Sequence, residues 1–237
     1  MSQETQETLE SLSDPAAKLA AVRSRAYGAF AELFEYPDDE LYEAVCSGTL
    51  VQVLQDVLGA VDASLVEGGR WEALTEAGEK DDLAVEFTRL FDVGAGGPPC
   101  PLYGGLYVGA RMKTMEEVVR FYNHFGLTLS ESPRELPDHV TTELEFLHFL
   151  AFREAQAIEQ GAEPDPFRRA QRDFIARHLG RWIPKLLAKL EGADAMPFFP
   201  ELVGRLERLL EHELERLVGM LGRPPTGRVG STVTGGR

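Results

Sequence analysis

Two imidazoles and two carboxylates lie within the segment LPDHVTTELEFLHFL, at positions 136–150. Glu145 and His148 form one Glu-x-x-His motif, the spacing with which di-iron carboxylate proteins place two metal ligands on one face of a helix. His139 and Glu143 are one helical turn apart, as in a histidine base that a carboxylate orients. The segment therefore has the residue types for either a metal site or acid–base catalysis.

The rest of the sequence supports neither kind of chemistry. A di-iron site needs the motif twice, and no other histidine has a glutamate three residues before it. The chain also lacks a nucleophile elbow, a P-loop and a dinucleotide-binding glycine motif. The structural alternative is that Asp138 caps a helix, while His139 and Glu143 form a local pair on its surface. We favour this alternative over catalysis, and a helical metalloprotein or enzyme that uses the Glu/His cluster is the second hypothesis.

A long irregular segment indicates a binding surface. GAGGPPCPLYGGLY, residues 94–107, contains three prolines and five glycines, which exclude a regular helix or a central strand. Long loops of this kind in compact domains are often functional. Together with the segment before it, the loop would present an apolar recess lined by Phe87, Leu90, Phe91, Pro98, Pro99, Pro101, Tyr103 and Tyr107.

We expect acidic side chains to form the rim of this recess, namely Glu86, Asp138 and Glu143. The whole chain carries a formal net charge of −15, which disfavours nucleic acid and anionic membranes and attracts a basic partner. An apolar peptide with basic residues nearby fits such a surface. For Phe87 and Leu90, the hydrophobic core is the alternative location.

The composition predicts a cytoplasmic globular protein. The 237 residues, 43% of them hydrophobic, are enough for one large domain or two small ones. No apolar run approaches ~18 residues, so we expect no membrane span. The first residues, MSQETQETLE, lack the basic and apolar regions of a secretory signal. The two cysteines, Cys46 and Cys100, suit a reducing compartment as free thiols.

Apolar residues recur at helical spacing along the chain, and no segment alternates with a period of two over six residues. We therefore predict an all-α fold, a single-domain bundle of roughly 8–10 helices with one long Pro/Gly-rich loop. The domain would span residues 13–222, between a disordered N-terminus (1–12) and a disordered tail (223–237). The predicted helices lie at about 15–36, 38–45, 50–61, 82–93, 112–125, 137–160, 165–191 and 199–221.

Three local signals refine these boundaries. Ser13 or Asp14 can cap the first helix, with Pro15 in its first turn. Gly126 is a natural C-cap for the helix that precedes it. Pro184 interrupts the long helix at 165–191 and should kink it, because proline lacks the N–H group that the helix needs.

Taken together, these segments resemble the TorD/DmsD/NarJ family of redox enzyme maturation chaperones. The resemblance covers about residues 20–220, and its most specific part is PDHVTTELEFLHFLAFREA at 137–155. The other matching pieces, in the same order, are EFTRLF (86–91), CPLYGG (100–105), FYNHFGL (121–127) and FIARHLGRWIPKLLAKL (174–190). The chain also looks like the chaperones that serve type II molybdoenzymes of the dimethyl sulfoxide reductase family, whose clients include dehydrogenases and oxyanion reductases.

The resemblance implies a cytoplasmic binding protein with no reaction and no cofactor of its own. Such proteins bind the precursor catalytic subunit of a molybdenum enzyme, often at its twin-arginine signal peptide, until the molybdopterin guanine dinucleotide cofactor of the client is inserted. It also implies a monomer or a homodimer, with the linker at 126–137 as a hinge. Some relatives bind guanine nucleotides weakly, and no P-loop supports that here. Where many relatives have an acidic or hydroxyl residue, this chain has Gly104 and Gly105, which puts a peptide contact there in doubt.

The predicted function is therefore a client-specific chaperone, with no catalytic or metal-binding residue. Residue by residue, the resemblance places Leu90, Phe91, Pro101, Tyr103, Pro137, Asp138 and His139 in the peptide-binding region. The full predicted peptide-binding set adds two residues argued from the sequence itself, and it consists of Phe87, Leu90, Phe91, Pro101, Tyr103, Pro137, Asp138, His139 and Glu143.

Overall fold

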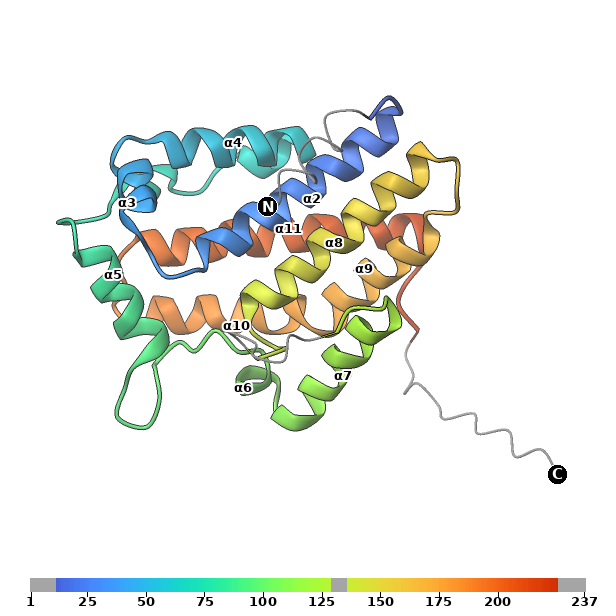
Figure 1. Cartoon of the computed structure of the whole chain (residues 1–237). Coiled ribbons are helices and arrows are strands. Elements are labelled where there is room, and N and C mark those ends of the chain that lie inside the picture. The colour runs from blue at the N-terminus through green and yellow to red at the C-terminus, as the bar shows by residue number, and fades with distance from the viewer. Residues whose placement is uncertain (1–11, 129–135, 226–237) are drawn as a thin grey trace.

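The computed structural model describes residues 12–128 and 136–225, and every regular element within these ranges is a helix (Figure 1). This confirms the all-α prediction. The α-helices are α2 (Pro15–Leu33), α3 (Asp39–Cys46), α4 (Thr49–Val61), α5 (Asp82–Phe87), α6 (Gly105–Val108), α7 (Arg111–His124), α8 (Val140–Glu159), α9 (Asp165–Arg177), α10 (Leu179–Gly192) and α11 (Phe198–Leu221). The shorter helical turns are η1 (Ala63–Val66), η2 (Trp71–Thr75) and η3 (Thr88–Asp92).

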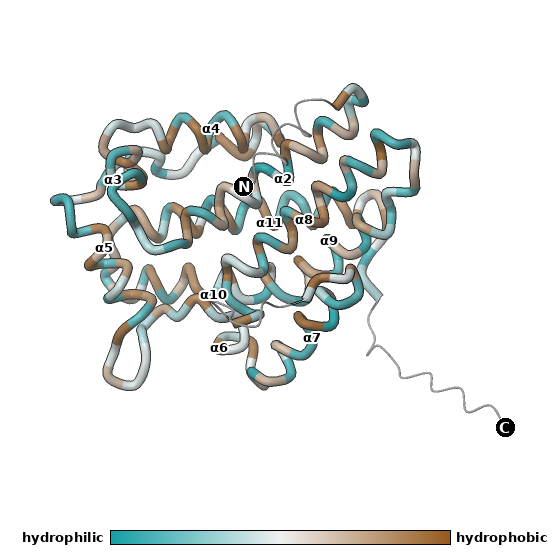
Figure 2. Tube along the Cα trace, in the orientation of Figure 1, coloured by the Kyte–Doolittle hydropathy of each residue, from teal (hydrophilic) through white to brown (hydrophobic). Residues whose placement is uncertain are grey.

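Helix α8 lies at the centre of the bundle, between α2 and α9 (Figure 1). Its buried side chains include Val140, Leu144, Leu147 and Ala151, which recur at helical spacing and form one apolar stripe. Figure 2 shows apolar residues interleaved with polar ones along the long helices, as expected for amphipathic helices around one core. The helix that carries Glu143, Glu145 and His148 therefore lies largely in the interior of the fold.

Small residues allow α2 and α8 to approach each other closely. Ala17, Ala20 and Ala21 on α2 are buried against Ala155 on α8. The start of α2 agrees with the sequence, because the Asp14 side chain accepts hydrogen bonds from the backbone N–H groups of Ala16 and Ala17. The N-terminal segment is therefore a structural part of the bundle from this cap onward.

A buried ionic network crosses the same part of the core. Glu154 of α8 has no exposed surface, and its carboxylate accepts hydrogen bonds from Arg23 (3.2 Å), Arg168 (2.9 Å) and Gln171 (2.8 Å). Glu213 of α11, also fully buried, lies 3.5 Å from Arg23 and 2.8 Å from Arg216. Four helices are thus joined through paired charges that would be costly to leave unpaired.

The break in the long helix at 165–191 lies elsewhere than predicted. α9 ends at Arg177 and α10 begins at Leu179, with His178 between them at φ −121°, ψ −100°. Pro184, the predicted kink, lies inside α10. Pro184 is the sixth residue of α10, so the N–H that it lacks is one that would otherwise donate to the carbonyl of Gly180 in the first turn of this helix.

Two further boundaries differ from the sequence prediction. The segment at 82–93 is α-helical only as far as Phe87 and continues as the π-helical turn η3. Residues 94–107 were predicted to contain no regular helix. This prediction is wrong for the last three of these residues, because the short helix α6 begins at Gly105. Gly126, predicted as the C-cap of α7, lies one residue beyond it, because the C-cap is Phe125 and Gly126 follows at φ +74°.

The terminal predictions lie mostly outside the described residues, which exclude 1–11, 129–135 and 226–237. Leu12, assigned by sequence to the disordered N-terminus, is buried against α2 and α8. The linker at 126–137, predicted as a hinge, is described only at its two ends. Within the described ranges, no single helix is both long and apolar enough to cross a bilayer.

Candidate functional site

The Pro/Gly-rich loop pairs directly with the segment that starts α8. Tyr103 and His139 form an isolated antiparallel β-bridge. The N–H of Gly104 donates to the carbonyl of Asp138 at 2.9 Å, and the N–H of Val140 donates to the carbonyl of Leu102 at 2.9 Å. The two sequence motifs that carry the family resemblance, 100–105 and 137–155, are therefore partners in space.

Asp138 holds the loop and does not cap the helix. Its side chain is completely buried, and Oδ2 accepts a 2.9 Å hydrogen bond from the N–H of Gly105. The N-cap of α8 is His139, whose Nδ1 accepts from the N–H of Thr141 at 3.3 Å. The predicted capping role of Asp138 is therefore wrong, because the carboxylate finds its donor 33 residues earlier in the chain.

Glu143 is also completely buried, and it faces α10. Its Oε2 accepts a 2.9 Å hydrogen bond from the indole N–H of Trp182. The partner of this oxygen is Trp182 and not His139, which was the predicted local partner. Asp138 and Glu143 were also predicted to lie on an exposed acidic rim, and this is wrong because both side chains are buried. Burial raises the pKa of the Glu143 carboxyl well above its usual range; the Trp182 N–H opposes this shift and the nearby Asp138 adds to it.

These contacts explain why glycine occupies positions 104 and 105. A Cβ atom on Gly104 would lie 2.8 Å from Trp182 Nε1, and one on Gly105 would lie 2.8 Å from Asp138 Oδ2. Both distances are shorter than real side chains tolerate. We refer to the contacts that join residues 100–105 to Asp138, Glu143 and Trp182 as the loop latch.

Replacing Gly105 with alanine should destabilise the protein by about 1–3 kcal/mol, because the added methyl would lie 2.8 Å from Asp138 Oδ2 and 2.9 Å from Arg111 Cγ. Urea unfolding followed by circular dichroism measures the loss. Gly192→Ala is the matched control, since nothing lies within 4 Å of its Cβ position in α10, and it should be neutral or slightly stabilising. Equal stability of the two variants would contradict the latch.

The apolar members of the predicted recess are core residues. Phe87, Leu90 and Phe91 are all buried, and the Phe91 ring packs against Phe87 (4.9 Å between centroids) and Phe199 (5.3 Å). The carbonyl of Leu90 accepts a hydrogen bond from the N–H of Cys100. Phe87, Leu90 and Phe91 pack beneath the loop, and their own side chains fill the space that was predicted to be a recess.

Pro101 and Pro137 are buried as well, and the carbonyl of Pro137 accepts a 2.8 Å hydrogen bond from the hydroxyl of Tyr122. Tyr103 is half-buried, with the guanidinium of Arg111 5.8 Å from the centre of its ring. Of the predicted peptide-binding set, Tyr103 has the most accessible side chain, and it lies on the outer surface of the latch.

Glu145 and His148 do not come together as a metal site. His148 Nδ1 lies 2.9 Å from the carbonyl and 2.8 Å from the hydroxyl of Ser24, which joins α8 to α2. Glu145 is exposed. Among the residues that the structure describes, no group of three or more His, Cys, Asp or Glu side chains is placed to hold a metal ion.

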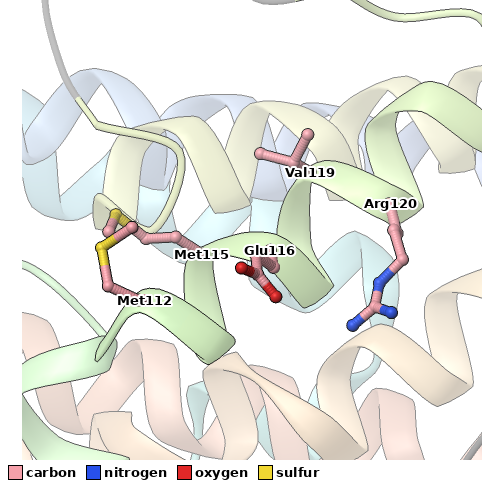
Figure 3. Close-up of a pocket in the computed structure, with 5 residues that line it drawn as sticks. All are labelled: Met112, Met115, Glu116, Val119 and Arg120. Atoms are coloured by element: carbon pink, nitrogen blue, oxygen red, sulfur yellow. The ribbon is translucent and has the colours of Figure 1, made fainter. Parts of the chain in front are cut away.

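The exposed surface contains a shallow depression that the sequence analysis missed. It has a volume of about 350 Å³ and lies along α7, lined by Met112, Met115, Glu116, Val119 and Arg120 (Figure 3). The buried face of α7 uses Thr114, Val118 and Tyr122. The sequence signal for this depression was a second apolar stripe at helical spacing on α7. The stripe begins at Met112, whose side chain is 68% exposed.

A second depression, of about 480 Å³, lies where α7, α8 and α9 meet. It is lined by His124, Phe125, Leu127, Phe149, Arg153, Pro166 and Phe167. Neither depression includes a residue of the predicted peptide-binding set. The latch and these two surface hollows are thus separate features of the fold.

Comparison with known proteins gives consistent results. Residues 48–188 match the family model described as nitrate reductase delta subunit. The chain is 39% identical over 161 residues to the selenate reductase assembly chaperone protein of Thauera selenatis, which covers 65% of this chain and 80% of that protein.

Two further relatives are also named as assembly chaperones. The perchlorate reductase assembly chaperone protein of Dechloromonas aromatica is 32% identical over 83% of this chain and 90% of its own length. The chlorate reductase assembly chaperone protein of Ideonella dechloratans is 34% identical over 71% of this chain and 76% of its own length. These relatives carry the names of chaperones for reductases, and none carries the name of an enzyme.

Proposed function

This chain belongs to the nitrate reductase delta subunit family, and from that premise we propose that it is an assembly chaperone for the catalytic subunit of a molybdenum oxidoreductase. It acts as a binding protein without a reaction of its own. It binds the precursor in the cytoplasm, at the twin-arginine signal peptide, while the molybdopterin guanine dinucleotide cofactor is inserted into the client.

The observation that carries this proposal is similarity to three chaperones of one kind. The relatives serve selenate, perchlorate and chlorate reductases by name, and each match covers at least 76% of the relative's length. A client that reduces an oxyanion is therefore the first candidate. The net charge of −15 supports a basic ligand, because it attracts twin-arginine peptides over long distances at low salt.

The closed latch constrains how a peptide reaches the predicted residues. Asp138, Glu143 and Leu90 have no exposed surface, so they contact a client only after the loop moves. Tyr103 is accessible without such movement. We propose that the client first contacts Tyr103, and that the more deeply buried members of the predicted set follow when the loop is displaced.

The identity of the client is tested in the source organism. The tagged full-length chain should co-purify with one molybdoenzyme catalytic subunit that still carries its signal peptide, as mass spectrometry detects. Deleting the gene for the chaperone should leave that subunit without its cofactor, and restoring the gene should recover it. Normal cofactor content in the deletion strain would contradict the proposed function.

The signal-peptide contact is tested separately, by calorimetry with a synthetic peptide of the client's signal sequence. We expect Tyr103→Ala to weaken binding about tenfold, as for an aromatic interface residue. Tyr42→Ala, at another half-buried tyrosine on α3, is the matched control and should bind normally. Affinity of the unmodified chain should fall between ~50 and ~300 mM salt as screening increases. If the client co-purifies but its signal peptide does not bind, the contact lies on the mature subunit instead.

A further inference from the structure

We propose that Glu143 carries a proton in the closed loop latch, and that loss of this proton releases residues 100–108 from the bundle. The inference concerns a conformational switch in the chain itself. Its consequence for a client, which would gain access to the residues beneath the loop, rests on the proposed function.

The first argument is geometric. Asp138 and Glu143 are both completely buried, and each has one oxygen with a donor: Gly105 N–H for Asp138 and Trp182 N–H for Glu143. The second oxygens, Asp138 Oδ1 and Glu143 Oε1, are buried and have no hydrogen-bonding partner among the described residues. Two ionised carboxylates would thus share one small interior region with a single donor each.

The two carboxyl groups are connected through the latch itself. Asp138 Oδ2 binds the N–H of Gly105, and the neighbouring Gly104 lies against the indole nitrogen that binds Glu143. A protonated Glu143 carries one negative charge fewer in this region and gains a donor. Ionisation of Glu143 would place a buried negative charge behind the loop, close to Asp138, with no new donor to stabilise it.

Among the residues that the structure describes, no cation is placed to compensate for such a charge. The influences on the Glu143 pKa are burial, the Trp182 hydrogen bond and Asp138, and none is an arginine, lysine or histidine. The cations on neighbouring elements point to other partners. Arg111 lies over the Tyr103 ring, Lys185 donates to the carbonyl of Tyr107, and Lys189 lies over the Tyr107 ring.

Burial also shifts the pKa values of other titratable groups around the latch. Burial raises the pKa of Tyr122 and of Tyr107 further above the usual range for tyrosine. Burial lowers the pKa of His178 to about 3, so its imidazole is neutral throughout. The other titratable side chains of residues 100–105 and 137–143 are Cys100, Tyr103, Asp138 and His139, and burial raises the pKa of the Cys100 thiol.

The direction of the pH dependence follows from linkage. Because the pKa of Glu143 is raised in the folded state, its stabilising contribution is complete below the pKa of an unfolded glutamate, about 4.3. That contribution is lost as the pH rises through the folded-state pKa. The latch should therefore open on the alkaline side and stay closed in acid.

Trp182 reports this opening directly, because it donates to Glu143 and is one of only two tryptophans in the chain. In a Trp71→Phe background, Trp182 fluorescence is measured with an aqueous quencher from pH 6 to 10. We expect quenching to increase in a one-proton transition while the helical circular dichroism persists. Adding Glu143→Gln, which keeps an oxygen for the Trp182 N–H, should abolish the transition.

Glu145→Gln is the matched control, since it removes an exposed glutamate of the same helix and should leave the transition intact. An unchanged transition in Glu143→Gln would overturn the proposal, as would a Trp182 that stays shielded until the helices unfold. Infrared difference spectroscopy of the unmodified chain gives an independent result if the variant does not fold. The band of a protonated carboxyl should be present at pH 6 and lost at high pH, and its absence at pH 6 would also overturn the proposal.

Discussion

Replacing Glu154 with alanine should lower the free energy of unfolding by about 3–5 kcal/mol, the range for removing one partner of a buried ion pair. The carboxylate is completely buried and accepts hydrogen bonds from three side chains, Arg23, Arg168 and Gln171. Its loss leaves Arg23, which is 4% exposed, with a charge in the core and Glu213 as its remaining counterion among the described residues.

Urea unfolding at constant pH and salt measures this effect. Glu154→Gln keeps the volume of the side chain and removes the charge, so it separates the lost ion pair from the lost packing. Glu145→Ala, an exposed position on the same helix, should change stability by no more than about 0.5 kcal/mol. A loss below about 1 kcal/mol for Glu154→Ala would mean that the surrounding arginines find other partners.

The network also predicts non-additivity. Arg23 contacts both Glu154 and Glu213, so each acid determines the environment of the other. Burial lowers the pKa of Arg23, and the two glutamates oppose that shift. The double variant of Glu154 and Glu213 should therefore differ from the sum of the single variants by more than about 0.5 kcal/mol.

Trp182→Ala should cost a comparable amount, about 3–5 kcal/mol, because a buried aromatic side chain leaves a large cavity. The loss has a local consequence as well. The Trp182 ring stacks on Tyr107 at 5.5 Å between centroids and contacts Gly104. Among the described residues, its N–H is the only hydrogen-bond donor to the Glu143 carboxyl. Limited proteolysis should therefore cut the variant between residues 100 and 110 faster than the unmodified chain.

Trp182→Phe separates these contributions. It retains most of the ring and removes the N–H, so Glu143 loses its donor at a cost of about 1–3 kcal/mol. Trp71→Phe is the matched control, because Trp71 is half-buried and donates to the carbonyl of Val66, far from the latch in sequence. Loop cleavage that rises equally in both variants would argue against a specific role for Trp182.

The helices of this protein are predictable from sequence because their signals are local. The core stripe of α8, the Asp14 cap of α2 and the Gly126 position after α7 depend on residues at most a few turns apart. The break at His178 was missed for the same reason. Local rules assign the interruption to Pro184, while packing of α9 and α10 on the bundle decides where the helix restarts.

The candidate site was predicted less well, and the cause is specific. A carboxylate is expected at the surface unless a partner compensates its burial. The compensating groups for Asp138 and Glu143 are Gly105 and Trp182, which lie 33 and 39 residues away in the chain. The same is true of the Arg23–Glu154 pair, whose partners are 131 residues apart.

The sequence by itself determined the helical class and the approximate helix ranges, and the resemblance placed the Pro/Gly-rich loop and the PDH segment together in one predicted binding region. The tertiary structure alone decided that the loop is closed over the PDH segment and that the carboxylates of Asp138 and Glu143 are buried. It also decided that Phe87, Leu90 and Phe91 belong to the core. The physical reason is that periodicity and capping energies act within one or two turns. Whether a polar group is buried depends on a donor that only the folded chain brings to it.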